Sequence, residues 1–530
     1  MAAPSRQRYW RSSSFPCSTS WCAGCFHAKP PSPNRWKTLR RRQENNVLQR
    51  LITLTFPLLL AGCISLDPNY QRPAAPVPTT MPQGAAYTAP SGKLSLSYPD
   101  IPWRDYVVDA KLRQVVEMGL SSSRDLREAI ANIESARALY GEQRSDLFPT
   151  INAGVDGSRG RALTGNGNAT AISQSYEATA GTSAFELDLF GKNRSLSRST
   201  FETYLAESEA AKSTRLTLIA DIVTDWVNVA AERSNLNAAR GTMESAKLSL
   251  AVTRKNQQNG ILSMVDVATA DTVYQQARSD VASYTTSAAQ AKNALDLVVG
   301  QSVPENLLPT DIAALSGIMK DIPANLSSQV LLNRPDVLEA EHNLKAANAN
   351  IGSARAAFFP SINLTASGGI GSGELSSLFS KGAGVWSFSP SISLPIFTGG
   401  YNTAQLNYTR AQKDLYVATY EKAVQTAFQE TADALARKGT IQEQLAAQTG
   451  YVAASQEYYR LAELRYRHGV DTYLTMLDAQ RTLYSARQSL ITTQQTEYQN
   501  LITLYKVLGG GISAEKQGDG VIANNVSLTQ

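Results

Sequence analysis

The sequence predicts an α+β membrane protein in which each chain supplies four β-strands and two long helical hairpins. One motif occurs twice, since Arg144-Ser-Asp-Leu-Phe-Pro-Thr-Ile-Asn152 returns as Arg355-Ala-Ala-Phe-Phe-Pro-Ser-Ile-Asn363. After each copy, apolar and polar residues alternate, and a long block almost free of proline follows. Because the same segments follow each copy of the motif in the same order, we expect two structurally equivalent halves, that is, an internal two-fold repeat.

The charge and hydropathy of the chain exclude several classes of protein. The chain has 50 Lys and Arg residues and 45 Asp and Glu residues, a net charge of +5, and part of this excess lies in residues 1–50. The body is therefore nearly neutral and offers no basic surface for nucleic acid. Outside the N-terminal region there is no run of about 18 uncharged apolar residues, as a membrane-spanning helix would need. Any membrane crossing by the body is expected to use β-strands.

The sequence shows no constellation of catalytic residues. Its three histidines, His27, His342 and His468, are scattered, and no glycine-rich phosphate loop or nucleophile motif occurs. His342 lies on a predicted helix, where we expect a packing or surface role rather than metal binding. We predict no enzyme activity, no metal site and no cofactor.

The first structured signal is an export segment. A short apolar run, Leu51–Leu60, follows Arg50 and leads into Leu60-Ala-Gly-Cys63, which has the regions of a secretory signal peptide. The end of this segment resembles a bacterial lipobox, which implies that Cys63 is lipidated and becomes the mature N-terminus. Ile64 follows Cys63 in place of aspartate, and by analogy with lipoprotein sorting this favours the outer membrane.

Residues 1–46 do not fit this picture, because they would place a long basic tail ahead of the signal. We interpret them as the product of a misplaced start, with Val47 at the true initiation codon. Four residues there have metal-site spacing: Cys17, Cys22, Cys25 and His27. Since they precede a cleaved signal, we expect them to have no role. The mature chain would then hold one cysteine, the lipid-bearing Cys63, and no internal disulfide.

Four segments show strand alternation. In Ser361–Ser367 and in Trp386–Ile396 every even position is apolar and every odd one is polar, apart from the prolines, and Ile151–Asp156 and Tyr176–Gly181 repeat the pattern. Glycine-rich stretches at 165–170 and 368–373 are expected to be the loops between paired strands. A soluble β-sandwich would also alternate, but serine-rich polar faces and aromatic ends favour a transmembrane barrel. Four strands cannot close such a barrel, so several copies of the chain must share one.

The blocks Gly191–Gly300 and Gly400–Gly509 have apolar residues at three-to-four spacing, which predicts long coiled helices. Each block is interrupted once, at Asn259-Gly-Ile261 and at His468-Gly-Val470, where glycine can end a helix. Ser263 and Thr472 can open the next helix in each case. A helix over 192–258 would be on the order of 100 Å long.

These signals divide the chain into eleven consecutive segments. They are a misassigned start (1–46), the signal peptide (47–62), a lipid-anchored, proline-rich extended tether (63–102), a helical segment (103–147), barrel hairpin 1 (148–191), helical hairpin 1 (192–300), an equatorial segment (301–334), a helix (335–357), barrel hairpin 2 (358–399), helical hairpin 2 (400–509) and a flexible tail (510–530).

Several motifs, taken in order, resemble one known family over residues 60 to 510. They are Phe185-Glu-Leu-Asp-Leu-Phe-Gly191, Asn333-Arg-Pro-Asp336, Ala349-Asn-Ile-Gly352, Leu394-Pro-Ile-Phe397 and Leu477-Asp-Ala-Gln-Arg481. The chain is similar to the outer membrane factor family, the TolC-like exit ducts of tripartite efflux systems, and to its lipidated OprM-like branch.

The resemblance implies a homotrimer in which twelve strands form one transmembrane β-barrel, continuous with a long periplasmic α-helical barrel. It implies a passive, gated conduit for drugs and other small molecules, lipid-anchored in the cell outer membrane and extending into the periplasm. The implied partners are a periplasmic adaptor protein, an inner-membrane pump of the resistance-nodulation-division type and outer-membrane lipid. The alternative that we keep open is the outer-membrane duct of a type I protein secretion system.

The resemblance also implies residue roles at the ends of the helical hairpins. Leu474 and Asp478, in Leu474-Thr-Met-Leu-Asp478, would close the periplasmic end as an apolar ring and a carboxylate ring. They are four residues apart and so share a helix face. Thr475 stands where TolC has a second acid, which argues against a double acidic ring. The implied adaptor-docking residues are Gly260, Ile261, Ser263, Gly469, Val470 and Thr472.

Overall fold

The structure is a computed structural model that describes residues 65–87, 101–163, 170–315, 317–320 and 327–511. The chain divides into two compact units, Met1–Cys63 and Ile64–Gln530, and the fold below is that of the second. The predicted start, signal peptide and lipid-bearing Cys63 lie outside the described residues, as does the tail beyond 511.

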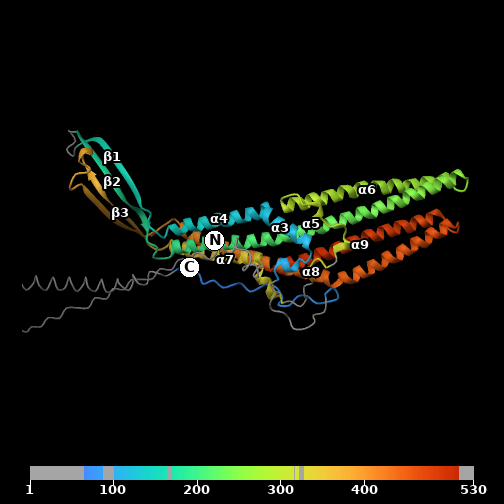
Figure 1. The fold of residues 1–530 in the computed structure, drawn as a ribbon. Helices are drawn as coiled ribbons and strands as arrows, with labels where there is room; N and C mark the ends of the chain where they lie inside the picture. The colour runs from blue at the N-terminus through green and yellow to red at the C-terminus, as the bar shows by residue number, and fades with distance from the viewer. Residues whose placement is uncertain (1–64, 88–100, 164–169, 316, 321–326, 512–530) are drawn as a thin grey trace, which may run out of the picture. The chain divides into compact units, whose positions relative to one another are not determined.

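Two series of elements follow one another in the same order. The first is α4 (Arg124–Ser145), β1 (Asn152–Leu163), β2 (Thr170–Glu186), α5 (Lys192–Gln258) and α6 (Met264–Val299). The second is α7 (Pro335–Ala356), β3 (Ser361–Ser372), β4 (Gly384–Ser393), α8 (Tyr401–Arg467) and α9 (Tyr473–Val507). Both α5 and α8 have 67 residues, and both α4 and α7 have 22. The strands lie at one end of the long helices and the turns of the helical hairpins at the other (Figure 1).

Shorter elements flank the two series. Before α4 come α2 (Trp103–Tyr106) and α3 (Ala110–Ser122), so the predicted helical segment 103–147 contains three helices. Between α6 and α7 lie the 3-10 turns η1 (Glu305–Leu307), η2 (Ala313–Leu315) and η3 (Ser328–Asn333), and η4 (Leu375–Ser377) lies between β3 and β4. No helix in the described part of the chain is long and apolar enough to cross a membrane.

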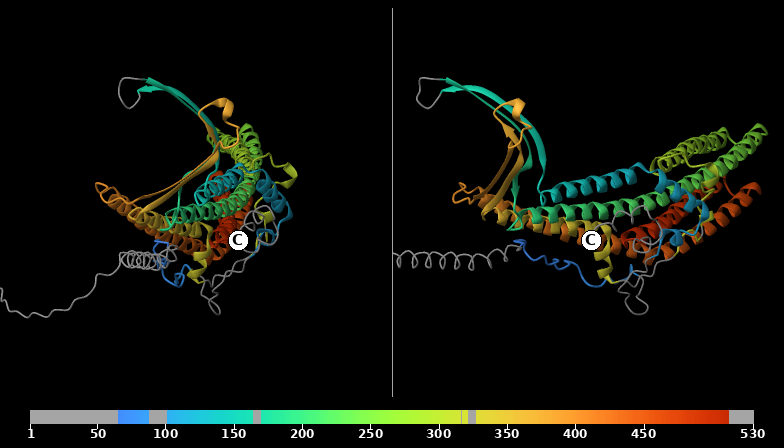
Figure 2. Two further views of the ribbon diagram at one scale, coloured as in Figure 1. Left: turned by 90° about the vertical axis from the view of Figure 1, so that its left-hand side faces the viewer. Right: turned by 60° about the vertical axis from the view of Figure 1, so that its left-hand side comes forward.

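The strands form one antiparallel sheet in the order β1-β2-β3-β4. Within the described residues, β1 and β4 each pair on one side only, so both edges are open. Paired residues share a face. One face carries the pairs Val155–Ala178 and Ala178–Ile370, while the other carries Asp156–Glu177 and Ser367–Ser387. The sheet is thus apolar on one side and polar on the other, and it curves strongly (Figure 2).

The expectation that residues 368–373 form a loop was wrong, because β3 continues to Ser372. A Cβ atom on Gly369 would lie 2.1 Å from the carbonyl oxygen of Ala178, and one on Gly181 would lie 2.2 Å from that of Ala366. These glycines permit close approach of β2 and β3 and do not mark a turn. The other predicted loop lies largely outside the described residues.

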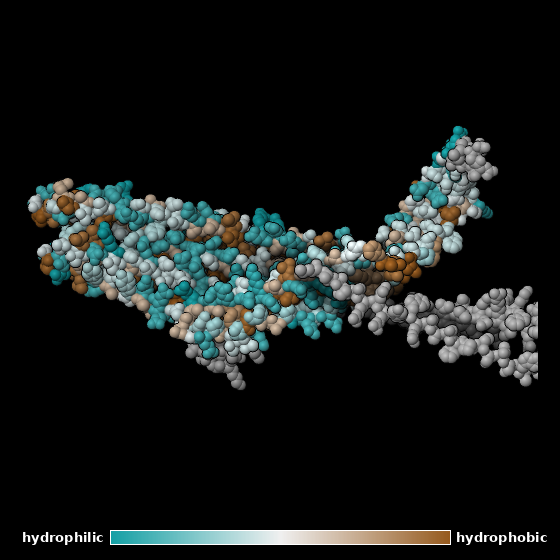
Figure 3. Space-filling view, turned by 180° about the vertical axis from the view of Figure 1, so that it is seen from behind, coloured by the Kyte–Doolittle hydropathy of each residue, from teal (hydrophilic) through white to brown (hydrophobic). Residues whose placement is uncertain are grey.

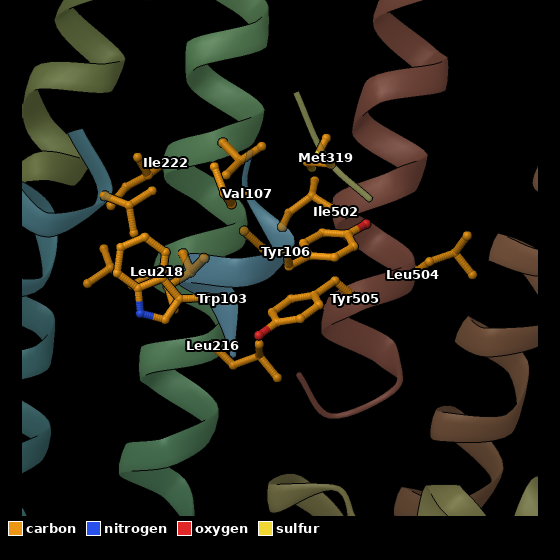
Figure 4. Close-up of a cluster of buried hydrophobic side chains, with 14 of the residues drawn as sticks. Trp103, Tyr106, Val107, Leu216, Leu218, Ile222, Met319, Ile502, Leu504 and Tyr505 are labelled. Carbon is orange, nitrogen blue, oxygen red and sulfur yellow. The ribbon is translucent and has the colours of Figure 1, made fainter. Parts of the chain in front are cut away.

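The main hydrophobic core lies where the two series meet, around α2, α5 and α9 (Figure 4). The rings of Tyr106 and Tyr505 stack with their centroids 4.4 Å apart. Their hydroxyls donate to the carbonyls of Leu501 at 2.7 Å and Ile101 at 3.0 Å. The hydroxyls of these two tyrosines are therefore satisfied, which favours one packing arrangement of α2 against α9.

The proline-rich tether is extended, but it is bound along α7. Arg355 donates to the carbonyl of Leu66 at 3.0 Å, Asn348 donates to that of Pro68 at 2.7 Å, and Tyr70 and Arg72 both contact the buried Glu341. Further along α7, His342 Nδ1 lies 2.7 Å from Glu202 Oε2 on α5. The histidine thus joins two helices, and no group of His, Cys, Asp and Glu able to hold a metal occurs in the described residues.

Candidate functional site at the hairpin turns

The turn between α5 and α6 is built on a left-handed glycine. Gly260 has φ = +74°, its N–H donates to Gln257 O at 2.9 Å, and the N–H of Ile261 donates to Asn256 O at 2.9 Å. This pair of bonds is the Schellman arrangement, which satisfies the last carbonyls of a helix. A Cβ at Gly260 would meet no atom of the chain within 4 Å. Glycine is required here by the backbone angle and not by crowding.

The turn between α8 and α9 repeats this backbone. Gly469 has φ = +72°, its N–H donates to Tyr466 O at 3.0 Å, and the N–H of Val470 donates to Arg465 O at 2.9 Å. Here too a Cβ would meet nothing within 4 Å. In addition, the Arg465 guanidinium lies 2.5 Å from an oxygen of Asp471, and this hydrogen bond lowers the pKa of the Asp471 carboxyl.

The helices that leave the two turns are capped differently. Ser263 accepts a bond from the N–H of Asp266 at 3.3 Å, and Asp266 accepts one from the N–H of Ser263 at 2.9 Å, which completes a capping box. The Ser263 bonds lower the pKa of Asp266. Thr472 accepts from the N–H of Thr475 at 3.4 Å, and threonine has no carboxylate to return the bond. The first turn therefore uses its acid to fix the helix start.

A small core holds the two hairpins together near the turns. Tyr473, Met476 and Leu477 of α9 are buried in a cluster with Leu250 of α5 and Ala270 of α6. Hydrogen bonds also join the two hairpins. Ser245 of α5 lies 3.2 Å from the hydroxyl of Tyr459 on α8, and Gln480 of α9 donates to Ser245 at 3.3 Å. The start of α9 is thus held against the first hairpin.

This packing leaves Leu474 and Asp478 on the opposite, open face of α9. The Leu474 side chain is 68% exposed, and Asp478 is exposed as well. Within the described residues Asp478 has no hydrogen-bond or ion-pair partner. The helix spacing thus brings an exposed apolar side chain and an exposed carboxylate together on one face of α9.

The predicted docking residues lie in the two turns, three in each. Ile261 and Val470 are apolar yet 68% and 61% exposed, and Met264 and Val265 beside the first turn are also exposed. Figure 3 shows hydrophobic residues gathered at this end of the hairpins. Sequence reasoning missed Asp266 and the Arg465–Asp471 pair, although the spacing Ser263-Met-Val-Asp266 is a capping-box signal.

Comparisons with known proteins identify the family. The profile of the outer membrane efflux protein family matches residues 115–301 and 326–510. The chain is 44% identical over 464 residues to a probable efflux pump outer membrane protein, TtgC of Pseudomonas putida, a match that covers 87% of this chain and 95% of the relative. It is 37% identical to the outer membrane protein OprJ of Pseudomonas aeruginosa over 473 residues, 89% of this chain and 97% of that protein.

A solved structure agrees with these sequence matches. The open state of the outer membrane channel MtrE of Neisseria gonorrhoeae superposes with a TM-score of 0.75 at 37% identity, covering 85% of this chain and 99% of that one. The chain therefore belongs to the outer membrane efflux protein family, a class of outer-membrane efflux ducts and not of enzymes.

Proposed function

We propose that three copies of this chain form the passive, gated exit duct of a tripartite pump, with one shared twelve-stranded barrel and one periplasmic helical barrel. The internal two-fold repeat supplies each copy with two similar strand pairs and two similar helical hairpins. Drugs and other small molecules would leave the cell through this duct.

One observation carries this proposal. The sheet has one apolar face, and both of its edges are unpaired in the described part of the chain, whereas open edges are not tolerated in lipid. A sheet of four strands is also too narrow to close on itself, because the smallest membrane barrels have about eight strands. Pairing β1 of one copy with β4 of the next removes every edge and turns the apolar faces toward lipid.

The open face of α9 supplies the gate of this proposal. Threefold symmetry would bring three copies of Leu474 and three of Asp478 around the axis. The leucines would narrow the opening, and three carboxylates held close together would repel one another unless cations were bound. The absence of any partner for Asp478 in the described part of the chain supports this role, because a carboxylate engaged elsewhere could not serve it.

The two turns supply the docking surface for a periplasmic adaptor. Their glycines leave the backbone open, and Ile261 and Val470 offer apolar contacts beside it. Ser263 and Thr472 fix the direction of the following helices. Energy for transport would come from an inner-membrane pump of the resistance-nodulation-division type, which the adaptor connects to the duct.

The lipid on Cys63 would anchor the tether that α7 binds. Mass spectrometry of the purified protein should find a lipidated N-terminal cysteine and no peptide from residues 1–46. An intact Met1 peptide from membrane-inserted protein would overturn this part of the proposal.

The experiment that tests the duct itself combines mass and conductance. The full chain, purified in detergent, should have the mass of a trimer and should form discrete channels in a planar bilayer. A stable monomer that keeps its strands in lipid would contradict the shared barrel. For the cargo class, expression in cells that lack their own efflux duct should raise resistance to small drugs, whereas restored export of a protein toxin alone would favour type I secretion.

A further inference from the structure

Two arginines lie on the apolar face of the sheet. Along β1 the residues Val155, Gly157, Arg159 and Arg161 alternate onto one face, and their partners on β2 are Ala178, Tyr176, Gln174 and Ile172. Val155 and Ile172 are among the exposed apolar side chains of this face. Two carboxylates of this hairpin, Asp156 and Glu177, form a pair on the other face, and the third, Glu186, lies at the base of β2 and pairs with Lys192.

The arginines lie at the end of the sheet that is farthest from the helices. Tyr176 pairs with Ser372, the last residue of β3, and the partners of Arg159 and Arg161 lie beyond this point. Figure 2 shows the β1–β2 hairpin projecting past β3 and β4. From Ile151 to Arg161 the chain extends about 34 Å, and a strand tilted by about 40° rises roughly 26 Å over this length, close to the roughly 25 Å height of the apolar band of a membrane barrel. Arg161 would therefore lie at the far edge of that band, and Arg159 about 5 Å inside it, where its long side chain can reach the edge.

Nothing in the described part of the chain neutralises these two arginines. Arg159 and Arg161 are exposed, and in the described residues neither makes a hydrogen bond or an ion pair. Their partners on this face, Gln174 and Ile172, are uncharged. The sequence of residues 164–169, Thr-Gly-Asn-Gly-Asn-Ala, contains no acid. Two unbalanced cations about 7 Å apart thus lie beside an apolar surface.

We propose that Arg159 and Arg161 bind the phosphate group of an anionic lipid headgroup in the distal leaflet of the membrane. The inference rests on the proposed barrel, which turns this face toward lipid. Guanidinium groups bind phosphate oxygens through paired, charge-assisted hydrogen bonds, and their aliphatic stems pack on apolar surface. Tyr176 lies between the arginines and the apolar band, over Gly157, where a Cβ would come 3.2 Å from its ring. Acyl chains would contact Val155 and Ala178 below, so a lipid fits this site better than a free phosphate ion.

The test uses native mass spectrometry of the full-length protein in detergent, titrated with phosphatidylglycerol or with phosphatidylcholine of the same acyl chains. The parent should prefer phosphatidylglycerol, and Arg159→Gln with Arg161→Gln should weaken its binding about tenfold, with phosphatidylcholine binding unchanged. Arg410→Gln with Lys413→Gln removes the same charge from α8 and should keep the preference. Arg159→Lys with Arg161→Lys should fall between, because lysine keeps the charge but loses the paired geometry.

Other outcomes would overturn the inference. An unchanged lipid preference in the glutamine variant would do so, as would equally good competition by soluble glycerol phosphate, which would mean a site for the free anion. Loss of the trimer in uncharged detergent on the glutamine substitutions would assign the arginines to a subunit contact instead. Insertion of the parent into phosphatidylcholine membranes is measured separately. If the parent does not insert, the proposed duct itself is contradicted, whereas normal insertion without a lipid preference contradicts only the lipid site.

Discussion

The two hairpin turns have the same backbone but place their acids differently. Each turn has a glycine in the left-handed region followed by an exposed apolar residue, and each next helix opens with a hydroxyl cap. At the third position of the following helix the first turn has Asp266 and the second has Thr475. Three residues later the first turn has Thr269 and the second has Asp478. The first carboxylate is bound within its own turn, whereas the second has no partner among the residues that the structure describes.

This difference shows how two turns with the same backbone can serve different proposed roles. An acid at the third position of the helix accepts a hydrogen bond from the N–H of the cap residue, so its carboxylate is already bound within the turn. An acid one turn further along is too far from the cap residue to bond it. It lies on the same face as Leu474, where it could bind cations that pass through the proposed duct. The stability of the first turn and the proposed gate of the second are therefore separable, and they can be tested by matched substitutions.

The largest expected effect is the opening of the gate. Leu474→Ala with Asp478→Ala should raise single-channel conductance several-fold in planar bilayers, because the substitutions remove both proposed rings. The matched variant in the first turn, Val265→Ala with Thr269→Ala, should conduct as the parent does. Expression and trimer mass should be unchanged in both.

If neither double variant alters conductance, the constriction lies outside the second turn. If both alter it equally, the two turns are not specialised as we infer. The polar face of the sheet, with Asp156 and Glu177, would then be the next place to search.

Charge alone should have a smaller effect. Asp478→Asn keeps the size of the side chain and removes the charge, so the preference for cations over anions should fall while conductance changes little. Asp266→Asn, in the first turn, should leave ion selectivity unchanged, because that carboxylate is held by Ser263. Reversal potentials under a salt gradient measure the ion selectivity of both variants. A selectivity that survives Asp478→Asn would exclude this carboxylate as the filter.

A still smaller effect is expected from the caps. Ser263→Ala should destabilise the start of α6 by about 1 kcal/mol, the usual contribution of a helix cap. Thr472→Ala should cost less at the start of α9, since its bond is longer and no acid completes the box. Hydrogen exchange of the first turns of α6 and α9 compares the two directly. Equal losses of protection would mean that the capping box adds nothing to a single cap bond.

Much of this architecture could be predicted because its signals are local. The breaks expected at Asn259-Gly-Ile261 and His468-Gly-Val470 coincide with the ends of α5 at Gln258 and α8 at Arg467. Glycine after a helical pattern needs no distant partner to be recognised. Strand alternation is equally local, and it placed the apolar and polar faces of the sheet.

What could not be predicted depends on contacts between distant residues. The sequence predicts an extended tether, but proline-rich sequence has no periodicity that would show its contacts with α7, where Arg72 bonds Glu341 and Asp67 lies against Gly352. The glycines of β3 resemble a loop until β2 is placed beside them. The proposed constriction is a third case, because Leu474 and Asp478 could only form rings with the same residues of other copies.

The smallest effect separates the two turns by pH. The hydrogen bonds from Ser263 hold the pKa of Asp266 below its ordinary value of about 3.9, so the ionised carboxylate stabilises the folded turn. For a carboxyl whose pKa is lowered by folding, that stabilisation is fully present above the ordinary pKa and is lost as the pH falls through the folded value. The start of α6 should therefore lose protection from hydrogen exchange as the pH falls below about 4. The second turn holds Asp471, whose pKa is also lowered, so the comparison uses Asp471→Asn, in which the start of α9, with Thr475 at the third position, should not lose protection. Asp266→Asn should abolish the pH dependence in α6. Protection factors corrected for the intrinsic exchange rate measure this, and a parallel loss in α6 and α9 would show that acid acts on the whole hairpin end rather than on the capping box.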